Sequence, residues 1–151
     1  MYPTKILLAT DGSEESIPAA RTAVELANGT GSELHVAHAI STAPQRPYPR
    51  HFERARSEDL LQRKRLAALT LLDEKVRQVE KMGGIVAGSY YREGDPTDEV
   101  LSLAEELGVG MIITGGRRLA KLRMFWASSY PMELFRRAGC PVLIVRESKA
   151  E

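Results

Sequence analysis

The stretch KILLAT at residues 5–10 is a short apolar run that passes directly into the polar sequence DGSEES at residues 11–16. Near-continuous Ile and Leu over so few residues are typical of a strand that is buried on both faces, as in a parallel sheet. Asp11 and Gly12 are turn-forming residues and end the run. We therefore expect a buried strand at 5–10 that leads into a polar turn.

Four further apolar runs follow, each bounded by Gly, Pro, Asp or Ser. They are Glu33–Ile40 (ELHVAHAI), Ile85–Arg92 (IVAGSYYR), Gly110–Thr114 (GMIIT) and Pro141–Arg146 (PVLIVR). Segments with helical patterns separate the five runs. This alternation predicts a mostly parallel sheet with helices on both faces, in which binding residues lie just after the strands.

The first predicted helix has a cap at Ser13 or Ser16, carries Pro18 in its first turn, and ends at Gly29 or Gly31. The others have equally clear boundaries. The second is long and amphipathic and is closed by Gly83 and Gly84, the third runs from Pro96 to Gly108, and the fourth from about Pro131 to Ala138. The proline-rich segment Thr42–Phe52, before the second helix, is expected to be an exposed loop.

Composition limits the classes of function. Lys and Arg number 21 against 20 Asp and Glu, so no overall field favours nucleic acid or an anionic membrane. The length suits a single domain at 1–151, and the sequence starts without a leader pattern, so we expect a soluble cytoplasmic protein. The single cysteine, Cys140, excludes an internal disulfide and is expected to be a buried thiol beside a strand.

The connection after residues 110–114 is the most informative strand end. It holds Gly115 and Gly116, then cations at 117, 118, 121 and 123, and finally Ser128 and Ser129 before a helix. Glycines let a phosphate approach the main chain, and a helix N-terminus attracts anions, which makes this a candidate phosphate site. The same residues also suit an ordinary helix cap beside a solvated basic loop, and both interpretations stay open.

Polar side chains also mark the ends of the first two strands. Asp11 either forms a turn or accepts hydrogen bonds from a base or sugar. His35 and His38 are expected to share one face of the second strand, in a core or strand-end role rather than as metal ligands. The chain contains no GxGxxG, GxxxxGK[ST] or GxSxG, which argues against dehydrogenase, P-loop and hydrolase sites.

Four segments carry a family resemblance. They are KILLATDGSEES (5–16), ELHVAHAI (33–40), REGDPTDEVLSLAEELGVGMIITGG (92–116) and CPVLIVRE (140–147). In this order and spacing they resemble the universal stress protein family. The resemblance implies a Rossmann-like α/β fold, similar to the adenine nucleotide alpha hydrolases, with five parallel strands in the order 3-2-1-4-5. It also implies a homodimer that pairs through the last strand, Pro141–Arg146.

Nucleotide-binding members of that family carry G-x2-G-x9-G-[ST] after the fourth strand. Counted from Gly115, the later positions fall on Arg118, Ser128 and Ser129, so only Gly115 and Ser129 match. Arg118 adds a side chain where backbone N–H groups approach phosphates, yet a guanidinium also binds phosphate. The nucleotide-binding residues that the resemblance implies are Ala9, Asp11, Ala39, Thr114, Gly115, Arg118, Ser128, Ser129 and Tyr130.

Three functions follow from this resemblance. The favoured one is a non-catalytic, dimeric stress-response protein that holds an adenine nucleotide, ATP or AMP, as a regulatory ligand, with Mg²⁺ if the ligand is a triphosphate. The alternative is a nucleotide-independent module, blocked by Arg118, that docks an unknown protein partner. A weak ATPase or phosphotransferase comes third, because no His or second carboxylate can be placed beside Asp11 to activate water.

Overall fold

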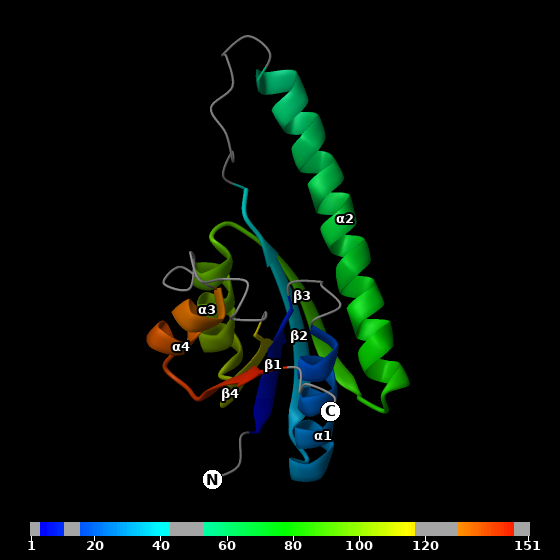
Figure 1. Ribbon diagram of the computed structural model, residues 1–151, viewed down its shortest axis with the longest axis vertical. Coiled ribbons are helices and arrows are strands. Elements are labelled where there is room, and N and C mark those ends of the chain that lie inside the picture. Colours follow the sequence, from blue (N-terminus) through cyan, green and yellow to red (C-terminus); the bar gives the residue numbers. More distant parts are fainter. Residues whose placement is uncertain (1–3, 11–15, 43–52, 117–129, 147–151) are drawn as a thin grey trace.

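The computed structural model describes residues 4–10, 16–42, 53–116 and 130–146 of the chain. Within these ranges strands and helices alternate strictly. The elements are β1 (Lys5–Ala9), α1 (Ile17–Thr30), β2 (Glu33–Ile40), α2 (Glu53–Lys81), β3 (Val86–Glu93), α3 (Pro96–Leu107), β4 (Met111–Gly115), α4 (Tyr130–Arg137) and β5 (Val142–Val145). All strand pairs are parallel, and the sheet has the order β3-β2-β1-β4-β5 (Figure 1). The predicted α/β fold and strand order are confirmed.

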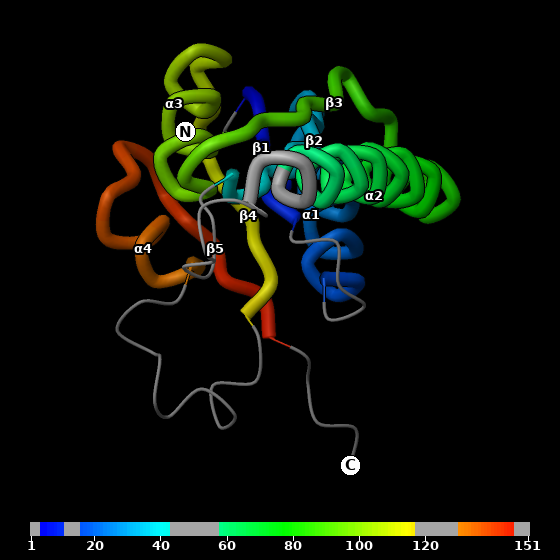
Figure 2. The backbone as a smooth tube through the Cα atoms, turned by 90° about the horizontal axis from the view of Figure 1, so that it is seen from above, coloured from blue at the N-terminus to red at the C-terminus, as the bar shows by residue number. Residues whose placement is uncertain are grey.

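Helices cover both faces of the sheet, and the residues of its central strand alternate between them. Ile6 and Leu8 belong to a core cluster with residues of α1 and α2, whereas Leu7 and Ala9 belong to a second cluster with residues of α3 and α4. All four residues are at most 1% exposed. Figures 1 and 2 show α1 and α2 on one side of the sheet and α3 and α4 on the other. Burial on both faces explains why this strand is apolar at nearly every position.

Most helix ends match the prediction, but the side chain of Ser16, at the N-cap position of α1, makes no capping hydrogen bond. Pro18 lies in the first turn of α1, and Gly31 ends that helix with a φ of 69°, a value that favours glycine. Gly29, the alternative end, lies inside α1. The Asp95 side chain caps α3 by accepting a hydrogen bond from Asp98 N at 3.0 Å. None of the helices in the described ranges is both long and apolar enough to cross a bilayer.

Strand boundaries differ slightly from those predicted. β1 ends at Ala9 rather than Thr10, because the Thr10 carbonyl bonds to a side chain instead of continuing the ladder. β3 begins at Val86, and Ile85 before it is 82% exposed. Outside the described residues lie Ser13 and the proline-rich segment 43–52.

The carboxyl edge of the sheet is set back at its central strand. The last pairs of β1 join Ala9 to Ala37 on β2 and to Thr114 on β4. From there β2 continues to Ile40 and β4 to Gly115. We call the position beyond Ala9, between the ends of β2 and β4, the β1 end. The strand order reverses here, and parallel α/β sheets bind ligands at such points.

Candidate functional site

The backbone of Ala39 is directed toward the β1 end. Successive residues of a strand send their N–H and C=O groups to opposite neighbouring strands. Ala37 O accepts from Thr10 N at 2.9 Å on the β1 side, whereas Ile40 O accepts from Gly94 N at 3.0 Å on the β3 side. Ala39 therefore directs both of its backbone groups to the β1 side, where the β1 ladder has already stopped.

Strand β4 forms the opposite border of the β1 end. Gly116 N donates to Val145 O at 2.8 Å, so by the same alternation Gly115 directs its carbonyl to the β1 side. A Cβ on Gly116 would lie 2.8 Å from Ile144 Cγ2, so a larger residue there would require the Ile144 side chain to shift. Gly115 and Ala39 are both half-buried. Main-chain polar groups from two strands thus border the β1 end.

Side chains from both neighbouring strands bond to the last carbonyl groups of β1 and Thr10. Thr114 Oγ1 donates to Ala9 O at 3.1 Å, and His38 Nδ1 donates to Thr10 O at 2.8 Å. Thr10, His38 and Thr114 are at most 5% exposed. Buried polar groups that are paired in this way hold a strand end firmly in place. These hydrogen bonds therefore fix the positions of the Ala9 and Thr10 carbonyl groups beside the candidate site.

Five of the predicted nucleotide-binding residues lie together at the β1 end. Ala9, Ala39 and Tyr130 pack in the second core cluster, and Thr114 pairs with Ala9 across the sheet. Gly115 follows Thr114 directly. Outside the described residues lie Asp11, Arg118, Ser128 and Ser129. The structure thus brings Ala9, Ala39, Thr114, Gly115 and Tyr130 together, and the places of Asp11, Arg118, Ser128 and Ser129 stay predictions.

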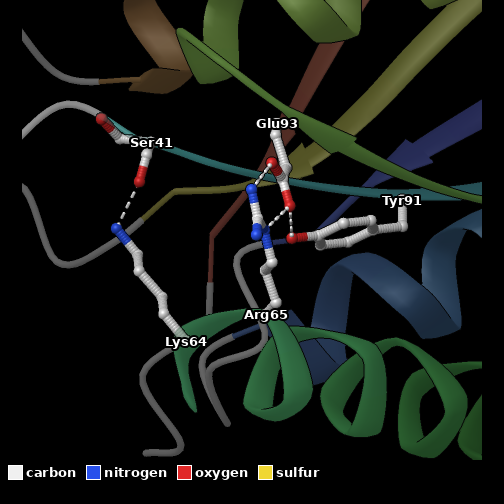
Figure 3. A network of polar contacts seen from close by, with 5 residues as sticks. All are labelled: Ser41, Lys64, Arg65, Tyr91 and Glu93. Carbon is white, nitrogen blue, oxygen red and sulfur yellow. Dashed lines mark hydrogen bonds and ion pairs between the residues drawn. The ribbon is translucent and has the colours of Figure 1, made fainter. Parts of the chain in front are cut away.

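A polar network that sequence reasoning missed ties α2 to the ends of β2 and β3 (Figure 3). The Arg65 guanidinium donates to both carboxylate oxygens of Glu93, with Nη2 at 3.0 Å from Oε2. Tyr91 OH donates to Glu93 Oε1 at 2.8 Å. Lys64 Nζ donates to the Ser41 carbonyl, just beyond β2. We call these five residues the α2 clasp.

The α2 clasp shifts the pKa values of Glu93 and Tyr91. Hydrogen bonds, first from Arg65 and then from Tyr91, lower the pKa of the Glu93 carboxyl. Burial, followed by the hydrogen bond to Glu93, raises the pKa of Tyr91 to about 12. Glu93 therefore stays charged and Tyr91 neutral across the physiological range. In the sequence, a run of cations at residues 63–65 is typical of a solvated helix face and gives no sign of this contact.

The two strand histidines lie on opposite faces of the sheet, so the expectation that they share one face is wrong. Side chains alternate along a strand, and His35 and His38 are three positions apart. His35 contacts Glu33 Oε2 and Tyr90 OH, both at 3.1 Å. In the part of the chain that the structure describes, no group of three or more His, Cys, Asp or Glu suits a metal ion.

Cys140 is half-buried beside β5 rather than fully buried. Burial raises the pKa of its thiol, and a hydrogen bond with the Ile112 backbone opposes that shift only in part. The thiol is therefore protonated at neutral pH, as in a structural cysteine rather than a nucleophile.

Comparisons with known proteins identify the family and agree with the fold. A model of the universal stress protein family matches residues 3–146. Universal stress protein YxiE of Bacillus subtilis is 34% identical, over 94% of this chain and 98% of that protein. A solved universal stress protein in complex with cAMP has a TM-score of 0.72 at 21% identity, covering 98% of this chain and 100% of that one. The universal stress protein from Archaeoglobus fulgidus in complex with dAMP has a TM-score of 0.62 at 20% identity, covering 97% and 100%.

Proposed function

The chain belongs to the universal stress protein family, and from that premise we propose that it binds an adenine nucleotide at the β1 end as a regulatory ligand. The observation that carries the proposal is the direction of the Ala39 backbone, whose N–H and C=O point past the last pair of β1. Two proteins of the same fold, described in complex with cAMP and with dAMP, support an adenine base as the ligand.

The backbone of Ala39 suits the edge of an adenine ring. Adenine presents a hydrogen-bond donor, its amino group, beside a ring nitrogen acceptor, and proteins read such edges with paired donors and acceptors. One extended residue offers an N–H and a C=O on the same side, which is the complementary pair. The alanine side chains at 9 and 39 are small, so they do not extend far over the neighbouring backbone. The base is therefore placed against β2.

The phosphates are placed near the start of α4. This helix begins at Tyr130, directly after Ser129 in sequence, and helix N-termini attract anions through free N–H groups and a partial positive charge. Asp11, Ser128 and Arg118 are proposed to complete the site, with Arg118 pairing with phosphate in place of the missing glycine. With a triphosphate, Mg²⁺ accompanies the ligand.

We propose a non-catalytic role for the bound nucleotide. The described groups that border the β1 end are backbone amides, the Thr114 hydroxyl and the His38 imidazole, and both side chains already donate to buried carbonyl groups. Nε2 of His38, the ring nitrogen that remains an acceptor, has little access to an attacking water because the residue is only 5% exposed. We therefore propose that the nucleotide acts by stabilising one form of the protein.

A homodimer through β5 is the second part of the proposal. β5 is an edge strand, and its four residues, Val142–Val145, are all apolar and only half-buried. An apolar edge with unpaired N–H and C=O groups is a template for pairing with another strand. A second copy of the chain satisfies both the hydrogen bonds and the apolar side chains.

Acid extraction of the purified protein, followed by chromatography, tests whether nucleotide co-purifies. Thermal unfolding is then followed with AMP, and with ATP and Mg²⁺. A ligand at one hundred times its dissociation constant stabilises by about 2.7 kcal/mol. No co-purified nucleotide and no stabilisation at millimolar concentrations would overturn the proposal and favour the interaction module. The double variant Arg118→Gly, Ser128→Gly then shows whether those side chains block the site, because binding should appear once they are removed.

A further inference from the structure

We infer that His38 is a positioning residue that keeps the Ala39 N–H available to a ligand. The imidazole donates to the carbonyl of Thr10, which the sheet would otherwise use to bind Ala39. The replacement of a backbone hydrogen bond by one from the His38 side chain is a property of this chain by itself. Its consequence for a ligand rests on the proposed nucleotide function.

The β1–β2 ladder stops one hydrogen bond early. In a parallel ladder, a bond from Thr10 N to Ala37 O is followed by a bond from Ala39 N to Thr10 O. The first of these is present at 2.9 Å. The second would pair Thr10 with His38, yet the last β1–β2 pair is Ala9 with Ala37. The ladder therefore ends where the Ala39 N–H would enter it.

The side chain of His38 takes the place of that missing bond. Its Nδ1 lies 2.8 Å from Thr10 O, and because a carbonyl oxygen only accepts, Nδ1 carries the hydrogen. His38 is 5% exposed and Thr10 is 3% exposed, so water does not readily compete for this carbonyl. Ala39 itself is half-buried although Ala37, His38 and Ile40 around it are buried. The imidazole thus satisfies the carbonyl and leaves the neighbouring N–H facing the β1 end.

Two variants separate this role from simple packing. His38→Asn keeps a donor N–H close to the position of Nδ1, whereas His38→Leu has none. His35→Leu is the matched control, because His35 is also buried on β2 but lies on the opposite face and bonds to Glu33 and Tyr90. Both leucine variants remove a buried imidazole and are expected to lose stability. Thermal unfolding measures this loss, so that it can be separated from an effect on the Ala39 N–H.

Amide hydrogen exchange at Ala39 is the first readout. In His38→Leu the Thr10 carbonyl loses its imidazole donor and Ala39 N–H can take that place, so protection of this amide should rise at least about 10-fold, as one hydrogen bond of about 1.4 kcal/mol predicts. The affinity for AMP should fall by about the same factor. His38→Asn should stay close to the wild type in both measurements, and His35→Leu should change neither.

Nitrogen-15 NMR of the wild-type imidazole at pH 8 supplies a readout that needs no variant. We expect the hydrogen on Nδ1. A hydrogen on Nε2 alone, or an unchanged Ala39 amide in a folded His38→Leu protein, would overturn the inference. If hydrogen exchange at the Ala39 amide changes as expected in His38→Leu but the wild type binds no AMP, the hydrogen-bond role of His38 stands and the proposed nucleotide function fails. Equal AMP affinity in wild type and His38→Leu would refute the positioning role itself.

Discussion

At the scale of single residues, the phenol of Tyr91 has a strongly perturbed acid–base equilibrium. Its pKa is raised to about 12, mainly by burial and then by its hydrogen bond to Glu93. In the unfolded chain a tyrosine has a pKa near 10. Because the folded-state pKa is the higher one, this group stabilises the fold fully below about pH 10, and the stabilisation is lost as the pH rises toward 12.

Absorbance titration of the phenolate tests this shift. The difference between the wild type and Tyr91→Phe should show one tyrosine that ionises near pH 12 instead of near pH 10, because burial disfavours the phenolate and ionisation would also break the hydrogen bond to Glu93. Tyr90→Phe removes the neighbouring phenol on the opposite sheet face and is the control. A difference spectrum that titrates near pH 10 would contradict both the burial of the Tyr91 phenol and its hydrogen bond to Glu93.

At the scale of elements, α2 is held to the sheet by the α2 clasp as well as by apolar packing. Arg65 and Glu93 are 35% and 27% exposed, whereas the pair between Arg63 and Asp59 on the outer face of α2 is 75% and 66% exposed. The ion pair between Arg65 and Glu93 is the stronger of the two, because it is less exposed to water and because Tyr91 donates a further hydrogen bond to Glu93. The α2 clasp therefore contributes more to the position of α2 than surface charges do.

Arg65→Met should lower the melting temperature by roughly 2–4 °C, and Arg63→Met should leave it nearly unchanged. The pKa of Glu93 is lowered in the folded protein, so its stabilisation is present above the carboxyl pKa of the unfolded chain. It is lost as the pH falls through the lower, folded-state value. The difference between wild type and Arg65→Met should accordingly shrink in acid. Equal melting temperatures for the two variants at pH 7 would contradict the role of the α2 clasp.

The turn that follows α2 depends on close packing at Gly84. A Cβ there would lie 2.8 Å from Val79 Cγ1, 2.9 Å from Val24 Cγ2 and 3.0 Å from Val79 O. Gly84→Ala should therefore destabilise the protein by about 1–3 kcal/mol through overpacking. Gly29 is the matched control, because it lies inside α1 with no atom within 4 Å of an added Cβ.

Gly29→Ala should stabilise the protein by about 0.5–1 kcal/mol, since alanine favours the helix interior more than glycine does. Urea unfolding of both variants gives the two free energies directly. Gly84→Ala as stable as the wild type would show that α1 and the turn after α2 are less closely packed than described.

The elements were easier to predict than their contacts. Buried parallel strands have a distinct composition, so the run at 5–10 and its four counterparts located the sheet, and Pro and Gly marked the helix ends. The contact of His38 with Thr10 and that of Arg65 with Glu93 each join residues 28 positions apart. Such contacts depend on strand register and on the placement of α2, which the composition of a segment does not specify.

At the scale of the whole molecule, the proposed dimer depends on β5 as a free edge. Ile112 N donates to Pro141 O and Gly116 N to Val145 O, so by strand alternation Ile144 directs its N–H away from β4. Ile144→Pro removes this outward donor and keeps the ladder to β4. Ser89→Pro is the control. It places a proline at an exposed position of β3, the edge strand on the opposite side of the sheet.

Sedimentation equilibrium should give a dimer for the wild type and for Ser89→Pro, and a monomer for Ile144→Pro. The physical reason is that pairing of two β5 strands needs the outward N–H groups of both copies. A monomeric wild type, or a dimer that persists in folded Ile144→Pro, would place the interface elsewhere or exclude it.

The central claim is that the Ala39 backbone binds the base of an adenine nucleotide at the β1 end. The most direct test follows the amide of Ala39 by proton–nitrogen NMR while AMP is added, with the amide of Ala87, exposed on β3, as the internal control. The account predicts that the Ala39 resonance shifts and its hydrogen exchange slows as AMP saturates, while Ala87 stays unchanged. An Ala39 amide that does not respond to saturating AMP would contradict the account.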